Sequence, residues 1–319
     1  MSNIHLHPTF TLPTSRPNSP RSFDFARVDV FAERALEGNS LSIFTDARGL
    51  STQEMQALAR ETNLSETTFI LPRKASVEQT HGVQVRIFTV AEELQFAGHP
   101  TLGTASWLYW NHPALRGADL ITLDLPIGPI PVRFSPPQPG EHGIFGTMKQ
   151  INPTFGTIHD RAQIAAALSL SVDDLDPDLP IQTVSTGMAF CIVPLRSLGV
   201  AARLQIPQNA ARAYLEPSDA KFFHCITRAG AASVADWHAR MQFYNGEDPA
   251  TGSASGCVIA YLVRHGLAAS AQPIVLEQGI EMHRPSRIHV RASLRDGMVE
   301  NVFVGGRTIN VASGRFFLP

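Results

Sequence analysis

The sequence predicts an α+β fold made of two similar halves. Segments with the alternating pattern of strands outnumber segments with the pattern of helices. The pattern P-x-x-G-[S/T]-A-S occurs twice, at residues 100–106 and 249–255 of the 319-residue chain, and each copy opens an apolar run typical of a helix. These observations favour a duplication, in which each half wraps a curved sheet around one apolar helix, over a chain of alternating strands and helices.

The first half contains short strands and one capped helix. Ser51 and Glu54 have the spacing of a capping box, which predicts a helix that ends near Asn63. Alternating apolar residues predict strands at 25–31, 41–44, 67–71, 83–88, 121–125 and 130–134. The proline-rich segment 135–140 is the best candidate for a linker. Residues 1–22 are rich in proline and poor in apolar side chains, so we expect a disordered extension there.

The second half repeats this plan loosely. It contains a short predicted helix at 161–168 and a second apolar helix after the repeated motif. Predicted strands lie at 181–184, 189–195, 221–226, 240–243, 274–277, 288–290, 298–304 and 308–311.

Composition is typical of a folded enzyme. Apolar residues make up 44% of the chain, charged residues make up 17%, and the net charge is −2. A net charge close to zero does not favour nucleic acid or an anionic membrane surface as a partner. No apolar stretch has the length of a membrane span. The three cysteines have neither disulfide nor zinc-site spacing, so we expect a reducing compartment and a cytoplasmic protein.

Several catalytic motifs are absent from the sequence. No G-x-G-x-x-G follows a strand, and neither a phosphate-binding loop nor an H-E-x-x-H motif occurs. Acid–base chemistry without cofactor or metal remains, and its candidate residues are Glu66, His99 and Asp248. Taken singly, Glu66 could be a solvated carboxylate and Asp248 a helix cap. His99 stands between a glycine and a proline, where a core role and a functional role are equally reasonable.

The repeated motif favours a functional role for these residues over a purely structural one. His99 and Asp248 each precede the proline of one copy, and we therefore expect them to hold equivalent places. Small residues at a helix start leave backbone N–H groups free to bind an anion. We predict one active site at a seam between the two halves, suited to removing a proton beside a carboxylate or carbonyl group.

Four segments carry a resemblance to a known family. Gly38-Asn39, residues 55–69, residues 96–105 and residues 247–254 resemble the PhzF family of phenazine biosynthesis, which shares the diaminopimelate-epimerase fold. Three shorter segments add to the resemblance, which covers roughly residues 24–319: Ser185-Thr186-Gly187, Gln278-Gly279 and Arg284-Pro285-Ser286. The resemblance implies an N-terminal domain at 23–136 that is completed by 307–319, a C-terminal domain at 137–306, and a homodimer.

The resemblance also implies a reaction. The family's type reaction is the isomerisation of trans-2,3-dihydro-3-hydroxyanthranilate, a small carboxylate, without cofactor or metal. Carried over by motif, Glu66 is the proton carrier, and His99, Asp248 and Ser253 complete the catalytic set. The residues expected to bind the substrate are Asn39, Ser65, Gly98, Thr251 and Gly252.

Two alternatives remain open. The first is an amino-acid epimerase or racemase on the same fold. Related epimerases use two cysteine thiols, whereas neither motif loop has a cysteine, and Cys257 lies beyond Ser253. The second is a binding protein that has kept the fold without catalysis.

Overall fold

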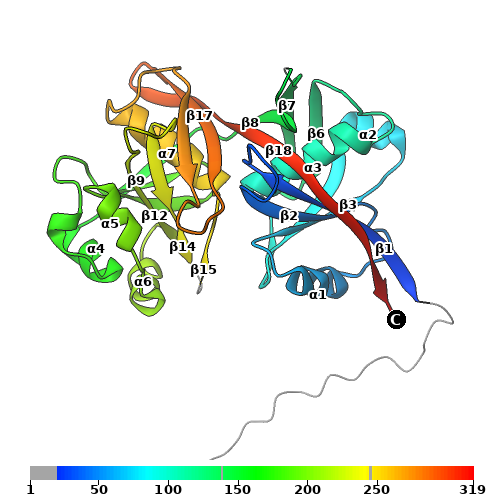
Figure 1. The fold of residues 1–319 in the computed structure, drawn as a ribbon, viewed down its shortest axis with the longest axis horizontal. Coiled ribbons are helices and arrows are strands. Elements are labelled where there is room, and N and C mark those ends of the chain that lie inside the picture. The colour runs from blue at the N-terminus through cyan, green and yellow to red at the C-terminus, as the bar shows by residue number, and fades with distance from the viewer. Residues whose placement is uncertain (1–19, 138, 244–245) are drawn as a thin grey trace, which may run out of the picture.

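The molecule consists of two lobes joined by one long strand. The computed structural model describes residues 20–137, 139–243 and 246–319. Strand β18 (Met298–Leu318) runs across both lobes, as Figure 1 shows. Helices and one large mixed sheet together make an α+β fold.

The helices are α1 (Thr52–Thr62), α2 (Ala75–His81), α3 (Gly98–Asn111), α4 (Arg161–Leu168), α5 (Leu198–Arg203), α6 (Gln208–Leu215) and α7 (Gly252–Arg264), with a 3-10 turn at Val172–Asp174. The strands of the first lobe are β1 (Arg21–Val30), β2 (Asn39–Phe44), β3 (Thr67–Leu71), β4 (Val83–Phe88), β5 (Glu93–Leu94), β6 (Leu120–Leu125), β7 (Gly128–Ser135) and β8 (Ile144–Lys149). Those of the second lobe are β9 (Thr154–Ile158), β10 (Gln182–Ser185), β11 (Ala189–Pro194), β12 (Phe222–Arg228), β13 (Trp237–Arg240), β14 (Gln242–Phe243), β15 (Gly246–Glu247), β16 (Ile274–Gln278) and β17 (Ser286–Arg295). None of the helices in the described ranges has the length and hydropathy of a membrane span.

A closed barrel surrounds α3 in the first lobe. Its strands follow the order β1-β2-β3-β4-β6-β7-β8-β18, and β18 closes the ring by pairing with β1. Helix α3 is buried over most of its length, as expected for a helix with apolar and small residues on every side. A Cβ on Gly103 would lie only 2.7 Å from side-chain atoms of Leu41 and Val30, so this glycine lets the helix approach the barrel wall.

The sheet of the second lobe continues from β18 in the order β17-β16-β13-β12-β11-β10-β9. Helix α7 packs against β10, β11, β17 and β18 on the inner face, and its residues Ala254 to Leu262 are all fully buried. A second core lies on the outer face, where side chains of α4, α5 and α6 pack against β11 and β12. Figure 1 shows these three helices at the far edge of the lobe.

The structure confirms most of the predicted local elements. Ser51 and Glu54 form the predicted capping box, and α4 spans the predicted range. The expectation of two strands at 298–304 and 308–311 is wrong, because β18 is continuous. Gly305 and Gly306 lie inside this strand, where neighbouring atoms leave no room for a side chain. A Cβ on Gly305 would lie 2.7 Å from the backbone oxygen of Gly146, and a Cβ on Gly306 would lie 2.5 Å from the Phe31 ring. Sequence patterns missed α2, α5, α6, β5, β8, β9 and β15, and the strand predicted at 240–243 shares only Arg240 with β13.

Two observations bear on the expected boundaries. The predicted extension 1–22 lies mostly outside the described residues, but Arg21 and Ser22 belong to β1 because they pair with Leu318 and Phe317 at the end of β18. The predicted linker 135–140 connects β7 to β8, which pair with each other, so it closes a hairpin of the barrel. The first lobe therefore includes β8. The remaining domain limits and the duplication stay predictions.

Candidate active site

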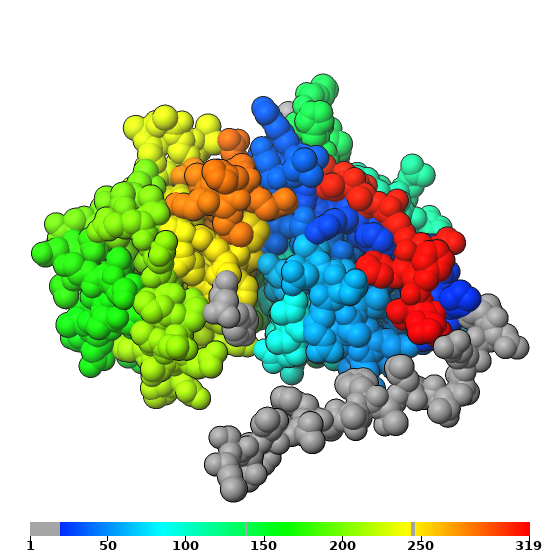
Figure 2. Space-filling view, turned by 60° about the horizontal axis from the view of Figure 1, so that its bottom comes forward, coloured from blue at the N-terminus to red at the C-terminus, as the bar shows by residue number. Residues whose placement is uncertain are grey.

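The N-termini of α3 and α7 meet across the seam between the two lobes. A Cβ on Gly98 would lie 2.9 Å from the backbone nitrogen of Ser253 and 3.1 Å from the carbonyl carbon of Gly252. Such a contact requires glycine at position 98, because any side chain would push the two helices apart. Figure 2 shows the same seam from outside, with the first lobe in blue and cyan against the yellow and orange part of the second.

Both helix starts carry backbone donors without a partner. Among the described residues, no acceptor is hydrogen-bonded to the amides of Gly98, His99, Gly252 or Ser253. Pro100 has no N–H to satisfy. Unpaired amides at two facing helix N-termini, with the positive ends of both helix dipoles, form an environment that favours a bound anion.

This geometry corrects the predicted equivalence of His99 and Asp248. Helix α3 begins at Gly98, so Pro100 lies in its first turn, whereas α7 begins at Gly252, three residues after Pro249. His99 therefore corresponds in position to Ser253, not to Asp248. Hydrogen bonds explain why α7 begins later than α3 relative to the proline of its motif. Thr251 (φ −112°, ψ 86°) is held outside the helix by bonds to Asp248 and Gln278.

Glu66 lies at the seam, between α1 and β3. Asn63, in the left-handed conformation (φ 51°), ends α1 and turns the chain toward this position. The Glu66 side chain is 16% exposed, and its Oε2 atom is 3.6 Å from Nδ1 of His99. This oxygen has no hydrogen-bond partner among the described residues. Burial, and then the charge of Asp248, raise the pKa of Glu66 well above its usual value.

His99 is the second residue of α3 and is almost fully buried. Burial lowers the pKa of its imidazole to about 3, so the ring is neutral and its contact with Glu66 is not an ion pair. The ring nitrogen Nδ1 lies 3.3 Å from the side-chain nitrogen Nδ2 of Asn39. The other ring nitrogen, Nε2, is buried without a partner in the described structure. Buried polar atoms without a partner are rare in folded proteins.

Asp248 is held by hydrogen bonds from both lobes. Its Oδ1 atom accepts from Asn39 Nδ2 at 2.7 Å and from Ser65 Oγ at 3.1 Å, and its Oδ2 atom accepts from Thr251 Oγ1 at 2.7 Å. Burial outweighs these bonds and raises the pKa of Asp248 to about 6. Because Asn39 and Ser65 belong to the first lobe, Asp248 links the two lobes beside Glu66.

Two residues that support this arrangement were not among the predicted site residues. Gln278 donates from Nε2 to the backbone oxygen of Asp248 at 2.7 Å. Arg284 donates to the backbone oxygens of Glu37 and Gly38 at 2.7 and 2.8 Å, and so holds the turn before Asn39. Both residues lie in segments that match the family pattern, but a contact 246 positions away along the chain leaves no local signal.

The structure brings all of the predicted site residues to the seam. Three ionisable side chains lie together there, namely Glu66, His99 and Asp248. Asn39 contacts His99, and Ser65 and Thr251 donate hydrogen bonds to Asp248. Gly98, Gly252 and Ser253 form the facing helix starts, where Ser253 contributes a backbone amide. A cavity of about 500 Å³ lies elsewhere, against α6, and is lined by none of these residues. The described residues contain no cluster of histidine, cysteine and carboxylate side chains that could hold a metal ion.

The chain matches the PhzC-PhzF family, described as phenazine biosynthesis-like protein, over residues 28–314. The chain belongs to the PhzF family. Trans-2,3-dihydro-3-hydroxyanthranilate isomerase of Pseudomonas aeruginosa is 34% identical to it over 294 residues, covering 91% of this chain and 98% of the relative. An uncharacterized isomerase of Mesorhizobium japonicum is 32% identical over 301 residues, covering 91% of this chain and 97% of the relative.

Solved structures agree with this assignment. The PhzF-family phenazine biosynthesis protein of Bacillus anthracis superimposes with a TM-score of 0.82 at 26% identity, over 93% of this chain and 99% of that one. The fold, the family match and the relatives therefore identify this chain as an isomerase of the PhzF family.

Proposed function

We propose that this PhzF-family isomerase moves a proton between two carbon atoms of a small carboxylate of the trans-2,3-dihydro-3-hydroxyanthranilate class, and that Glu66 carries the proton. The observation on which this rests is the Glu66 carboxyl group, with an unpartnered oxygen beside two facing helix N-termini. The name of the Pseudomonas aeruginosa relative supports the substrate class.

Each group then has a role in the reaction. The free amides of α3 and α7 bind the substrate carboxylate and stabilise the negative charge that develops when a C–H proton leaves. Glu66 accepts that proton and returns it to a second carbon, while the electron pair shifts along the conjugated system, so no oxidant or reductant is needed. A carboxyl group with a raised pKa is a stronger base than an exposed one, which suits proton removal from carbon.

Asp248 and His99 act beside Glu66. The neutral His99 ring lies within 3.6 Å of the Glu66 carboxyl group and offers a further proton-exchanging nitrogen. Asp248 raises the pKa of Glu66 and orders Ser65 and Thr251 through hydrogen bonds. These groups belong to the chain itself, and we propose that the reaction needs no cofactor or metal.

Replacement of Glu66 by glutamine tests the proposal. Glu66→Gln keeps the size of the side chain but cannot accept a proton, so the fold should remain while isomerisation of trans-2,3-dihydro-3-hydroxyanthranilate falls by about 100-fold or more, within the range for a general acid–base group. Glu61→Gln, on the exposed face of α1, is the matched control and should keep full activity. Undiminished turnover by the Glu66 variant would exclude it as the proton carrier.

Reaction in deuterium oxide separates this proposal from the alternatives. Proton transfer between two ring carbons gives a product with a shifted double bond, whereas an epimerase places deuterium at one inverted stereocentre. The two-thiol route has little support, because Cys257 is fully buried and burial raises the pKa of its thiol to about 11. Tight carboxylate binding without turnover of any tested substrate would favour a binding protein.

We also propose that the two lobes are the two domains of a duplicated diaminopimelate-epimerase-like fold and that the chain forms a cytoplasmic homodimer. Sedimentation equilibrium tests the last point, since a homodimer has twice the 34.7 kDa mass of the chain. A mass equal to that of one chain at micromolar concentration would contradict it.

A further inference from the structure

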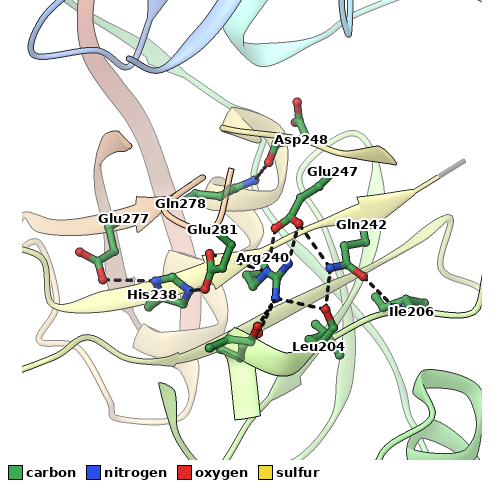
Figure 3. Close-up of polar contacts among 12 residues, drawn as sticks. Leu204, Ile206, His238, Arg240, Gln242, Glu247, Asp248, Glu277, Gln278 and Glu281 are labelled. Atoms are coloured by element: carbon green, nitrogen blue, oxygen red, sulfur yellow. Dashed lines mark hydrogen bonds and ion pairs between the residues drawn. The ribbon is translucent and has the colours of Figure 1, made fainter. Parts of the chain in front are cut away.

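A cluster of five charged side chains lies in the second lobe, next to the candidate site but outside it. Figure 3 shows its members, which are His238, Arg240, Glu247, Glu277 and Glu281. All five are largely buried, and the Arg240 side chain is only 6% exposed. Burial of five charged groups is costly unless they are paired and hydrogen-bonded.

Arg240 holds Glu247 with two parallel hydrogen bonds. Its Nε atom donates to Oε1 at 2.7 Å and its Nη2 atom donates to Oε2 at 2.6 Å. The third nitrogen, Nη1, donates to the backbone oxygens of Ala201 and Leu204 at the end of α5. A guanidinium group fixed on three sides in this way leaves Glu247 a single position.

Glu247 directly precedes Asp248 in the chain, so fixing Glu247 restricts where Asp248 can lie. The backbone N–H of Asp248 donates to the oxygen of Met241 at 2.9 Å, and its backbone oxygen accepts from Gln278 at 2.7 Å. The backbone at Asp248 is thus held from both sides, and its carboxylate points toward Asn39 in the other lobe. Figure 3 shows Asp248 on the side of the cluster that faces the first lobe.

The Glu247 carboxylate is also a source of negative charge near Asp248. After burial and the hydrogen bonds, the charge of Glu247 is a further cause that raises the pKa of Asp248. Arg240 lies directly against this charge and offsets part of it. The other groups that face Asp248 are Glu66 and the neutral His99, together with the hydrogen-bond donors Asn39, Ser65 and Thr251.

The rest of the cluster stabilises Arg240 from the opposite side. Glu281 approaches Arg240 Nε at 3.7 Å and also accepts from His238 at 3.1 Å, and His238 contacts Glu277 at 3.2 Å. Although burial opposes it, hydrogen bonds to Glu277 and Glu281 raise the pKa of His238 to about 9, so this side chain is a cation at neutral pH. Arg240 is therefore fixed between two carboxylates.

We propose that Arg240 is a positioning residue for the isomerisation: it places Asp248 in the seam through Glu247, and its charge shields Asp248 from that of Glu247. The role in isomerisation rests on the proposed function. The effect on Asp248 does not, because it is a property of the protein without substrate.

Carbon-13 NMR titration of the aspartate carboxyl carbons tests this, with the Asp248 signal assigned by its loss in Asp248→Asn. Arg240→Met exposes Asp248 to the unshielded Glu247 charge and should move the titration midpoint of Asp248 upward by about half a pH unit or more. Glu247→Gln should move the midpoint downward. The double variant Arg240→Met/Glu247→Gln should titrate like Glu247→Gln alone, which a loss of packing would not produce.

One control variant and a second route keep the test decisive. Arg295→Met, at an exposed arginine of β17, is the matched control and should leave the Asp248 midpoint unchanged. If Arg240→Met does not fold, Glu247→Gln and the double variant carry the test, because the first leaves Arg240 beside Glu281 and the second removes both charges of the pair. An unchanged midpoint in the folded variants would overturn the proposal whether or not the protein isomerises the substrate. If the midpoints shift as expected but no isomerisation occurs, the proposed function fails and the shielding stands.

Discussion

Addition of one methyl group at Gly98 tests the facing helix starts. In Gly98→Ala the new Cβ would lie 2.9 Å from the Ser253 nitrogen, whereas ordinary contacts begin near 3.4 Å, so the two helices must separate by about half an ångström. Overpacking of this kind costs about 1–3 kcal/mol, and the better helix propensity of alanine returns up to about 1 kcal/mol. We therefore expect a folded protein with a displaced seam.

Steady-state kinetics on trans-2,3-dihydro-3-hydroxyanthranilate measure the consequence. The methyl group would displace the amides that we propose bind the carboxylate, and kcat/KM should fall by about 10- to 100-fold, as for other small misplacements of reacting groups. Gly199→Ala is the matched control, because Gly199 is also near a helix start and the nearest atom to its added Cβ is 3.8 Å away. If Gly98→Ala keeps activity within about two-fold of the wild type while Gly199→Ala does the same, the substrate does not lie between these helices.

Two other predictions concern ionisation. Asp248→Asn removes the charge that raises the pKa of Glu66. The acidic limb of the pH–rate profile should therefore move to lower pH, even though the maximal rate falls. A limb that stays in place or moves to higher pH would contradict this coupling. Against the effect of burial, hydrogen bonds to Glu277 and Glu281 raise the pKa of His238 from 6.5 to about 9 in the fold. These ion pairs therefore stabilise the protein fully below pH 6.5 and lose their effect as the pH rises through 9. Urea unfolding should show that His238→Asn costs up to about 3 kcal/mol at pH 6 and much less at pH 9.5; an equal cost at both pH values would exclude this.

Local sequence signals predicted much of the fold because the interactions behind them are local. The Ser51 capping box and the left-handed Asn63 determine where α1 begins and ends, and both are visible in a few consecutive residues. The break predicted near Gly305 was wrong because a glycine that permits close approach cannot be distinguished, in sequence, from one that makes a turn. On the outer face, α4 was predicted, whereas the short helices α5 and α6 were not.

The candidate site was predicted in part. The motif segments located Glu66, His99 and Asp248, and the structure places them together. The repeat suggested the wrong correspondence between the halves, because the start of α7 is set by Gln278, a residue 27 positions away from Thr251. Interactions over such separations are determined by the folded sheet and not by spacing along the chain.

A crystal structure with a bound carboxylate analogue of the substrate, such as 3-hydroxyanthranilate, is the most direct test of the site. We expect its carboxylate to accept hydrogen bonds of about 3 Å from the amides at the starts of α3 and α7, with a ring carbon facing the Glu66 carboxyl group. An analogue bound instead in the cavity against α6, with the seam between Gly98 and Ser253 empty, would contradict the account.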